Sequence, residues 1–153
     1  MRRHLVICAL VLAACAKSDQ PAADTAAATP APPPPPPPIS LNDVAGTWTS
    51  KTMPMDRDTV LTTSELTATS TMNGWKLKLP NNQNVDVRVV SVAGDSIVSE
   101  AGPFKSVLRK GQMVSIHQIS RLKDGKMVGV THAMYKSDTA TLRFEATKKP
   151  AVP

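Results

Sequence analysis

The sequence predicts an all-β fold, namely a small antiparallel up-and-down barrel of about eight strands, with a β-sandwich as the alternative. Apolar residues recur at every second position in several short runs, as in Val85–Val89, where valines alternate with charged residues. This period of two places one set of side chains in a core and the other in water. Turn-forming pairs such as Asn73-Gly74 and Asp124-Gly125 separate the runs. No apolar pattern of helical period reaches a useful length, so helices contribute little to the predicted fold.

The chain begins with the layout of an export signal. Arg2 and Arg3 supply positive charge, and residues 5–12 form an apolar run too short to span a bilayer as a permanent helix. The next residues complete Leu12-Ala13-Ala14-Cys15, which resembles the lipobox of bacterial lipoproteins. In that family the chain is cut before the cysteine, and the cysteine is acylated. The resemblance implies a signal peptide over residues 1–14 and a lipid anchor at Cys15, which holds a protein stably once several acyl chains are attached. An ordinary signal peptide that ends in cysteine is the alternative.

Residues 15–40 are expected to form a linker. They are rich in Ala, Thr and Pro and end in seven consecutive prolines, Pro32–Pro38. Such a composition buries too little apolar surface to offset the entropy of ordering, so we expect disorder up to Ala31. The proline run predicts a stiff extended rod of about 20 Å. We interpret the linker as a spacer that holds the domain away from the membrane, with a ligand for a proline-binding module as the alternative.

The predicted domain spans residues 41–149, and residues 150–153 form a tail. Ser40 and Asn42 suit the cap of a single helical turn. Beyond it, the alternation predicts strands near residues 46–52, 59–72, 75–79, 85–92, 95–100, 105–109, 112–122, 126–136 and 140–147. Gly102-Pro103 is taken as a turn between two of these strands. A meander of so many strands exposes its edges unless it closes on itself, which favours the barrel.

The beginning of the first predicted strand carries a family resemblance. Gly46-Thr47-Trp48 resembles the Gly-x-Trp signature of lipocalin-like (calycin) barrels. In that family the tryptophan plugs one end of the barrel, and a basic residue near the last strand packs over it. The resemblance implies this plug role for Gly46 and Trp48, with Arg143 as the matching basic residue. This domain is shorter than a full lipocalin and has no disulfide, so the resemblance implies a narrower cavity.

The domain contains two histidines, His117 and His132. A two-residue hairpin at Asp124-Gly125 places them directly opposite each other, with Cβ atoms about 4.5–5.5 Å apart, within reach of a shared metal ion. Met113 and Met134 fall on the same face by parity, and their thioethers would suit copper. A three-residue loop would shift this pairing by one residue, and no carboxylate is clearly placed as a third ligand. A copper or zinc site is therefore an alternative to a structural role.

Charge and motif content argue against several classes of function. Without Arg2 and Arg3 of the signal, 16 Lys and Arg stand against 12 Asp and Glu, a net charge of +4. These charges are scattered singly and aromatic residues are few, which argues against nucleic acid as a partner. No nucleophile elbow, phosphate loop or reactive cysteine is present, so we expect neither an enzyme nor a cofactor.

The leading expectation is a non-enzymatic lipoprotein on the periplasmic face of the outer membrane. Ala16 follows Cys15, where an Asp would signal retention in the inner membrane. The resemblance to bacterial lipoproteins therefore implies sorting to the outer membrane. The extracytoplasmic side of another bacterial membrane is the alternative location. The barrel is expected to bind a small apolar ligand or to dock an envelope protein. Trp75, beside the turn at Asn73-Gly74, is the candidate to stack on a ligand, with core packing as its other role.

Overall fold

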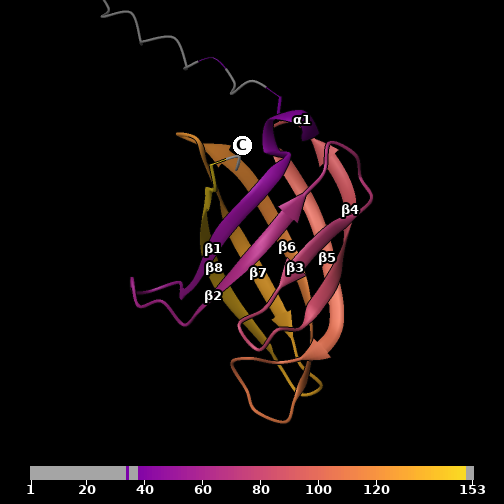
Figure 1. The fold of residues 1–153 in the computed structure, drawn as a ribbon. Helices are drawn as coiled ribbons and strands as arrows, with labels where there is room; N and C mark the ends of the chain where they lie inside the picture. Colours follow the sequence, from indigo (N-terminus) through magenta and orange to yellow (C-terminus); the bar gives the residue numbers. More distant parts are fainter. Residues whose placement is uncertain (1–33, 35–37, 151–153) are drawn as a thin grey trace, which may run out of the picture. The chain divides into compact units, whose positions relative to one another are not determined.

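The chain forms a closed antiparallel barrel of eight strands in the computed structural model, as the alternation predicts (Figure 1). The structure describes Pro34 and residues 38–150. The predicted signal peptide, Cys15, the predicted disordered part of the linker, most of the predicted proline rod and residues 151–153 lie outside the described residues. Consecutive strands pair in order, and the last strand pairs with the first. The sheet therefore closes as a barrel, and the alternative of a β-sandwich is not adopted.

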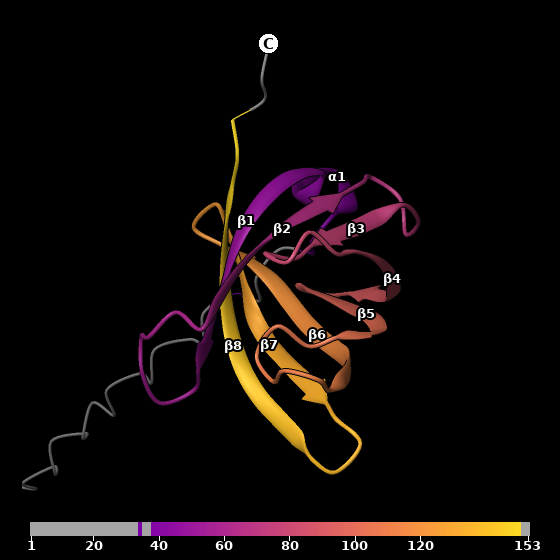
Figure 2. The same cartoon turned by 60° about the horizontal axis from the view of Figure 1, so that its bottom comes forward.

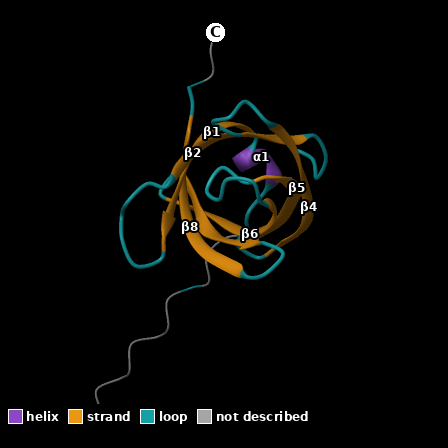
Figure 3. Ribbon diagram, turned by 90° about the horizontal axis from the view of Figure 1, so that it is seen from below, coloured by secondary structure: helices purple, strands orange, loops and turns teal. Residues whose placement is uncertain are grey.

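One short helix precedes the eight strands. The elements are α1 (Leu41–Val44), β1 (Gly46–Pro54), β2 (Thr62–Ala68), β3 (Trp75–Lys78), β4 (Asn84–Ala93), β5 (Ser96–Lys105), β6 (Met113–Lys123), β7 (Lys126–Met134) and β8 (Thr139–Lys148). Figure 3 looks along the barrel from below and shows the strands as a ring.

The prediction of a turn at Gly102-Pro103 is wrong. β5 runs through this pair to Lys105, so the predicted strands at 95–100 and 105–109 are not separate strands. The pairing of β5 with β6 shifts register between Ala101 and Phe104. A proline has no backbone N–H to donate, so it is tolerated where the ladder is already irregular. Residues 106–109 of the expected strand lie instead in the connection between β5 and β6, residues 106–112, here called the β5–β6 loop.

Helix α1 closes one end of the barrel. The Ser40 hydroxyl accepts a hydrogen bond from the Asn42 N–H at 3.2 Å, and the Asp43 carboxylate accepts one from the Ser40 N–H at 3.1 Å. This reciprocal capping box fixes the start of the helix, as expected for Ser40. The Ile39 N–H donates to the Gly94 carbonyl at 2.8 Å, which ties the incoming chain to the β4–β5 turn. Val44 is completely buried at this end.

The core has two parts. The part beneath α1 consists of Val44, Trp48, Leu66, Ala68, Trp75, Val89, Ile97, Met127, Phe144 and Ala146. The second part consists of Leu79, Val85, Ala101, Phe104, Val114, Ala133 and Leu142. The tryptophans lie in the first part, and the β5–β6 loop contributes to the second through Val107 and Leu108. Figure 2 turns the end opposite α1 toward the viewer.

Gly129 in β7 permits the close approach of neighbouring strands. A Cβ at this position would lie 2.0 Å from the Ile119 carbonyl oxygen and 2.8 Å from a ring carbon of Phe144. We expect Gly129→Ala to lower the free energy of unfolding by about 3 kcal/mol, because backbone atoms cannot move aside cheaply. Urea unfolding followed by tryptophan fluorescence measures this loss.

Gly94→Ala is the matched control. Nothing lies within 4 Å of a Cβ at Gly94, although the residue has φ +57°. The control should therefore cost only about 1 kcal/mol, the price of a left-handed backbone at alanine. Equal losses for the two variants would contradict the close approach at Gly129.

Candidate functional site

The barrel interior holds a cavity of about 90 Å³. Its lining includes residues of the β5–β6 loop, which lies at the end of the barrel opposite α1 (Figure 1). Five strands contribute polar uncharged side chains to the lining, namely Ser50, Thr52, Thr62, Ser64, Ser99, Gln118 and Thr131, and the connections add Ser106 and Tyr135. The apolar ones come from β2 through β8 and include Trp75, Leu77, Leu79, Val87, Phe104, Val114, Ile116, Ala133 and Leu142. The cavity is thus mixed in character rather than purely apolar.

The polar residues of the cavity lie side by side across the sheet. Ser50 of β1 pairs with Ser64 of β2. Ser99, Gln118 and Thr131 are neighbours in register across β5, β6 and β7. The Thr131 hydroxyl donates to Oε1 of Gln118 at 3.2 Å. The inner surface of the barrel therefore carries two small clusters of polar residues, one on β1 and β2 and the other on β5, β6 and β7.

Trp75 lies at this cavity. Its side chain is 2% exposed, and its indole N–H donates to the Thr71 carbonyl at 2.9 Å. The residue belongs to the core part beneath α1 and also lines the cavity. Its polar edge is therefore occupied, and what it offers inside the barrel is an apolar ring. Contact of this ring with a ligand stays a prediction.

Trp48 fills the barrel beneath α1. Its side chain is 1% exposed, and its indole N–H donates to the Val44 carbonyl at 2.8 Å. The ammonium of Lys148 lies 5.4 Å from the ring centroid and donates to the Asp43 carbonyl at 3.3 Å. Gly46 has φ +133°, and a Cβ there would lie 2.8 Å from Cε of Lys148. Glycine thus leaves the room through which Lys148 reaches the Trp48 ring, a favourable cation–π arrangement.

Arg143 is not brought to Trp48. It pairs with Met53 in the β1–β8 register, whereas Trp48 pairs with Lys148. The Arg143 guanidinium donates to the Pro54 carbonyl at 3.1 Å and also reaches the β1–β2 connection, where it contacts the Arg57 carbonyl and the Asp58 carboxylate. The basic residue over the tryptophan is therefore Lys148, and the assignment of Arg143 to the plug is corrected.

The hairpin between β6 and β7 has the predicted register. Lys123 pairs with Lys126 around the two-residue turn, and His117 pairs with His132. The imidazole centroids are 6.3 Å apart, with the ring planes at 28°. Because Gln118 and Thr131 line the cavity, alternation places both histidines on the outer face of the barrel.

The two methionines of the predicted metal site lie on the same hairpin as the histidines, Met113 on β6 and Met134 on β7. Met113 and Met134 are 51% and 42% exposed. Nδ1 of His132 lies 3.2 Å from the Thr141 hydroxyl. Within residues 38–150, no group of three or more His, Cys, Asp or Glu residues is arranged to hold a metal ion. The imidazole pair thus offers two nitrogen donors at the surface, apart from the cavity.

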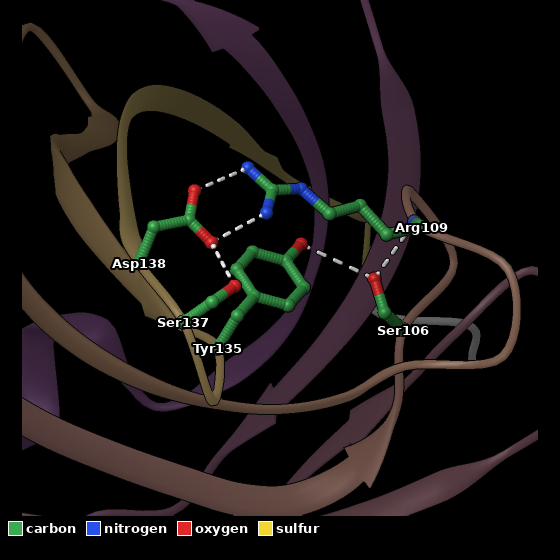
Figure 4. A network of polar contacts seen from close by, with 5 residues as sticks. All are labelled: Ser106, Arg109, Tyr135, Ser137 and Asp138. Carbon is green, nitrogen blue, oxygen red and sulfur yellow. Dashed lines mark hydrogen bonds and ion pairs between the residues drawn. The ribbon is translucent and has the colours of Figure 1, made fainter.

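A polar network includes residues that line the cavity at its end opposite α1, which we call the mouth, and Figure 4 shows its side chains. The Arg109 guanidinium donates to both carboxylate oxygens of Asp138 at 2.7 and 2.9 Å, and it lies 4.0 Å from the centroid of the Tyr135 ring. The Ser106 hydroxyl lies 3.2 Å from the Tyr135 hydroxyl and accepts from the Arg109 N–H at 3.0 Å. We call Ser106, Arg109, Tyr135 and Asp138 the mouth latch. It joins the β5–β6 loop to the connection between β7 and β8.

The latch holds cavity-lining residues in place. Ser106, Val107, Leu108 and Tyr135 all line the cavity. The hydrogen bonds from Arg109 hold the pKa of the Asp138 carboxyl below its usual range, and the same bonds raise the pKa of Arg109. Because the pair is bidentate and stacked on an aromatic ring, its geometry is more specific than that of an isolated surface ion pair.

No protein-family model matches this sequence, and the comparisons with curated proteins and with solved structures find no match either. In the part of the chain that the structure describes, no helix has the length and apolar character needed to cross a membrane. What the fold and site define is a small closed β-barrel with one plugged end, one latched mouth and a cavity between them.

The ion pair between Arg109 and Asp138 is expected to hold the β5–β6 loop in place. The amides of Leu108 and Arg109 both donate to the Ser106 hydroxyl. We expect Asp138→Asn to speed hydrogen exchange at these two amides roughly two- to fivefold, the range expected for loss of an exposed ion pair. Exchange measured by NMR at neutral pH gives the rates. Arg109→Asp combined with Asp138→Arg restores opposite charges and should restore part of the protection.

Acid should open the latch in the same way. A carboxyl whose pKa is lowered in the folded protein stabilises it above the unfolded pKa, and this contribution is lost as the pH falls through the folded value. Loop ordering should therefore decline below the ordinary Asp138 pKa of 3.8 in the unmodified chain. Asp138→Asn should show no such step. An acid step of the same size in both chains would assign the effect to other carboxyls.

Proposed function

We propose that this protein is a lipid-anchored bacterial envelope protein whose lipocalin-like barrel binds a small ligand in its cavity. The anchor is Cys15, and the location is the periplasmic face of the outer membrane. The observation that carries the binding role is the cavity between the plugged end and the latched mouth. Ligand sites are concave, largely apolar and fitted with a few polar groups, which describes this interior.

The size of the cavity limits what it holds. At about 90 Å³, it is smaller than pockets for drug-sized ligands, which span about 300–1,000 Å³. It is also smaller than the cavity of about 150 Å³ that holds benzene in an engineered core. The ligand is therefore a small molecule, or the narrow end of a larger one that extends through the mouth. Plain filling of a barrel core would leave no reason for the cluster of inward hydroxyls.

Docking of an envelope protein is the second candidate function. The outer face of the β6–β7 hairpin exposes Met113, Ile119 and Met134, at 51%, 36% and 42%. Exposed apolar side chains scattered singly are normal on soluble proteins, whereas interaction sites form larger contiguous patches. The cavity thus supports ligand binding more strongly than this face supports docking. Metal binding through His117 and His132 ranks below both, because the pair supplies only two donors.

The anchor is tested by replacing its cysteine. We expect Cys15→Ser to move the protein from the membrane fraction to the aqueous fraction of an expressing bacterium, because the acyl chains supply the membrane affinity. Immunoblots of the two fractions measure the shift. Cys8→Ser is the matched control, since Cys8 lies in the predicted signal. Equal membrane retention of both variants would contradict lipidation at Cys15.

The binding role is tested with the full chain purified from its native envelope. Native mass spectrometry should show a bound small molecule, and Thr131→Met should remove it, because the longer side chain fills the cavity. Thr141→Met is the matched control, since Thr141 pairs with His132 on the outer face. Circular dichroism checks that both variants fold. Loss from both variants, or an unliganded unmodified chain, would contradict binding inside the barrel.

A further inference from the structure

We propose that the cavity selects an uncharged ligand that carries a hydrogen-bonding group on one edge and an apolar remainder. This inference rests on the proposed function and names the chemistry of its ligand. It differs from the purely apolar ligand expected from the sequence. Three features of the lining carry it: hydroxyls open to the cavity, the position of the nearest charges, and an aliphatic wall.

Serine hydroxyls supply hydrogen-bonding groups on the cavity wall. Ser50 and Ser99 are buried, at 8% and 4% exposure, and both line the cavity together with Ser64. These three serine hydroxyls form no side-chain hydrogen bond with another described residue, and no fully buried side-chain polar atom of the described residues lacks a partner, so the hydroxyls are open to the cavity. Ser120 is the contrast: it is equally buried, but its hydroxyl donates to the Ile97 carbonyl at 3.2 Å. Hydroxyls that are open to a cavity make their hydrogen bonds with its contents, so the cavity serines bond to the water or the ligand that occupies it.

The Gln118–Thr131 pair adds directional groups to the same surface. The Thr131 hydroxyl uses its proton on Oε1 of Gln118, so its oxygen still accepts a further hydrogen bond. The Gln118 side chain also carries an amide donor group. A ligand hydroxyl or amide thus finds both donors and acceptors at the cavity wall, whereas a hydrocarbon satisfies none of them.

Charge selects against ions. The one acidic or basic residue of the lining is Glu100, and its carboxylate pairs with Arg88 at 2.5 Å. Its strand neighbours Ser99 and Ala101 are buried, so alternation turns the Glu100 side chain outward. A carboxylate or ammonium on the ligand would lose its hydration in the cavity and gain no counter-ion there. Burying such an unpaired charge is strongly unfavourable.

The aliphatic side of the cavity contacts the apolar part of the ligand. Leu77, Val87, Ile116 and Leu142 line the cavity with aliphatic carbon, and Trp75 adds a ring whose N–H is already bonded. Apolar surface buried there leaves water at a favourable free energy that scales with area. The arrangement fits a compact amphiphile such as a short alcohol, ester or amide, or the neutral end of a longer molecule.

Three probes of one chain length test this selection: 1-butanol, butanoate and butylammonium. Each is titrated into the ¹⁵N-labelled full chain at neutral pH, and the two indole N–H signals are followed by NMR. Trp75 lines the cavity, whereas Trp48 does not and serves as the internal control. We expect butanol to shift the Trp75 signal in a saturable way while Trp48 stays in place. Butanoate and butylammonium should bind at least about tenfold more weakly.

Serine variants assign the effect to the hydroxyls. Ser50→Ala combined with Ser99→Ala should weaken butanol binding about three- to tenfold, because up to two hydrogen bonds are lost with little change of shape. Ser91→Ala is the matched control, since Ser91 is exposed on β4. Unchanged butanol affinity in the double variant would overturn the role of the hydroxyls.

The outcomes separate this inference from the proposed function. If the three probes bind equally, the ligand class is wrong, while binding inside the barrel stands. If no probe shifts the Trp75 signal, this inference is overturned. The proposed function fails separately, when the protein purified from its envelope carries nothing that Thr131→Met removes.

Discussion

The pairing of β1 with β8 is the constraint on which the rest of the structure depends. It runs from Trp48 opposite Lys148 to Pro54 opposite Leu142, and it turns a meander with two free edges into a closed surface. Closure satisfies the backbone groups of both edge strands and gives every strand an inside and an outside. The same register sets Lys148 over the Trp48 ring and carries Arg143 to the β1–β2 connection. The positions of Lys148 and Arg143 therefore follow from the register in which β1 and β8 close the barrel.

Within the closed barrel, the two halves have different chemistry. Large side chains led by Trp48 and Trp75 fill the half beneath α1, and the capped helix covers it. In the other half small polar residues interrupt the aliphatic ones, so a cavity remains beside Ser50 and Ser99. The latch between Arg109 and Asp138 then orders a loop that has no strand to hold it. The packed half beneath α1 stabilises the fold, so the half that contains the cavity is available to bind a ligand.

Local chemistry in the sequence predicts the barrel well and the site less well. Alternation and turn residues predict the strands, and Asp124-Gly125 sets the register that pairs His117 with His132, as the structure confirms. Gly102-Pro103 misleads because a proline at an irregular pairing looks like a turn. The place of Arg143 in the last strand suggests it for the plug, whereas the residue that lies over Trp48 is set by the register between β1 and β8. Arg109 and Asp138 belong to separate loops, and no local pattern joins them.

Xenon under pressure tests the central claim most directly, because the gas enters apolar cavities that are open to solutes. In the ¹⁵N NMR spectrum of the full chain, we expect shifts that cluster at inward-facing residues around Leu77, Val114 and Leu142, with the signals around Trp48 unchanged. An interior without xenon shifts, or shifts centred beneath α1, would contradict a barrel that is plugged at one end and hollow toward the other.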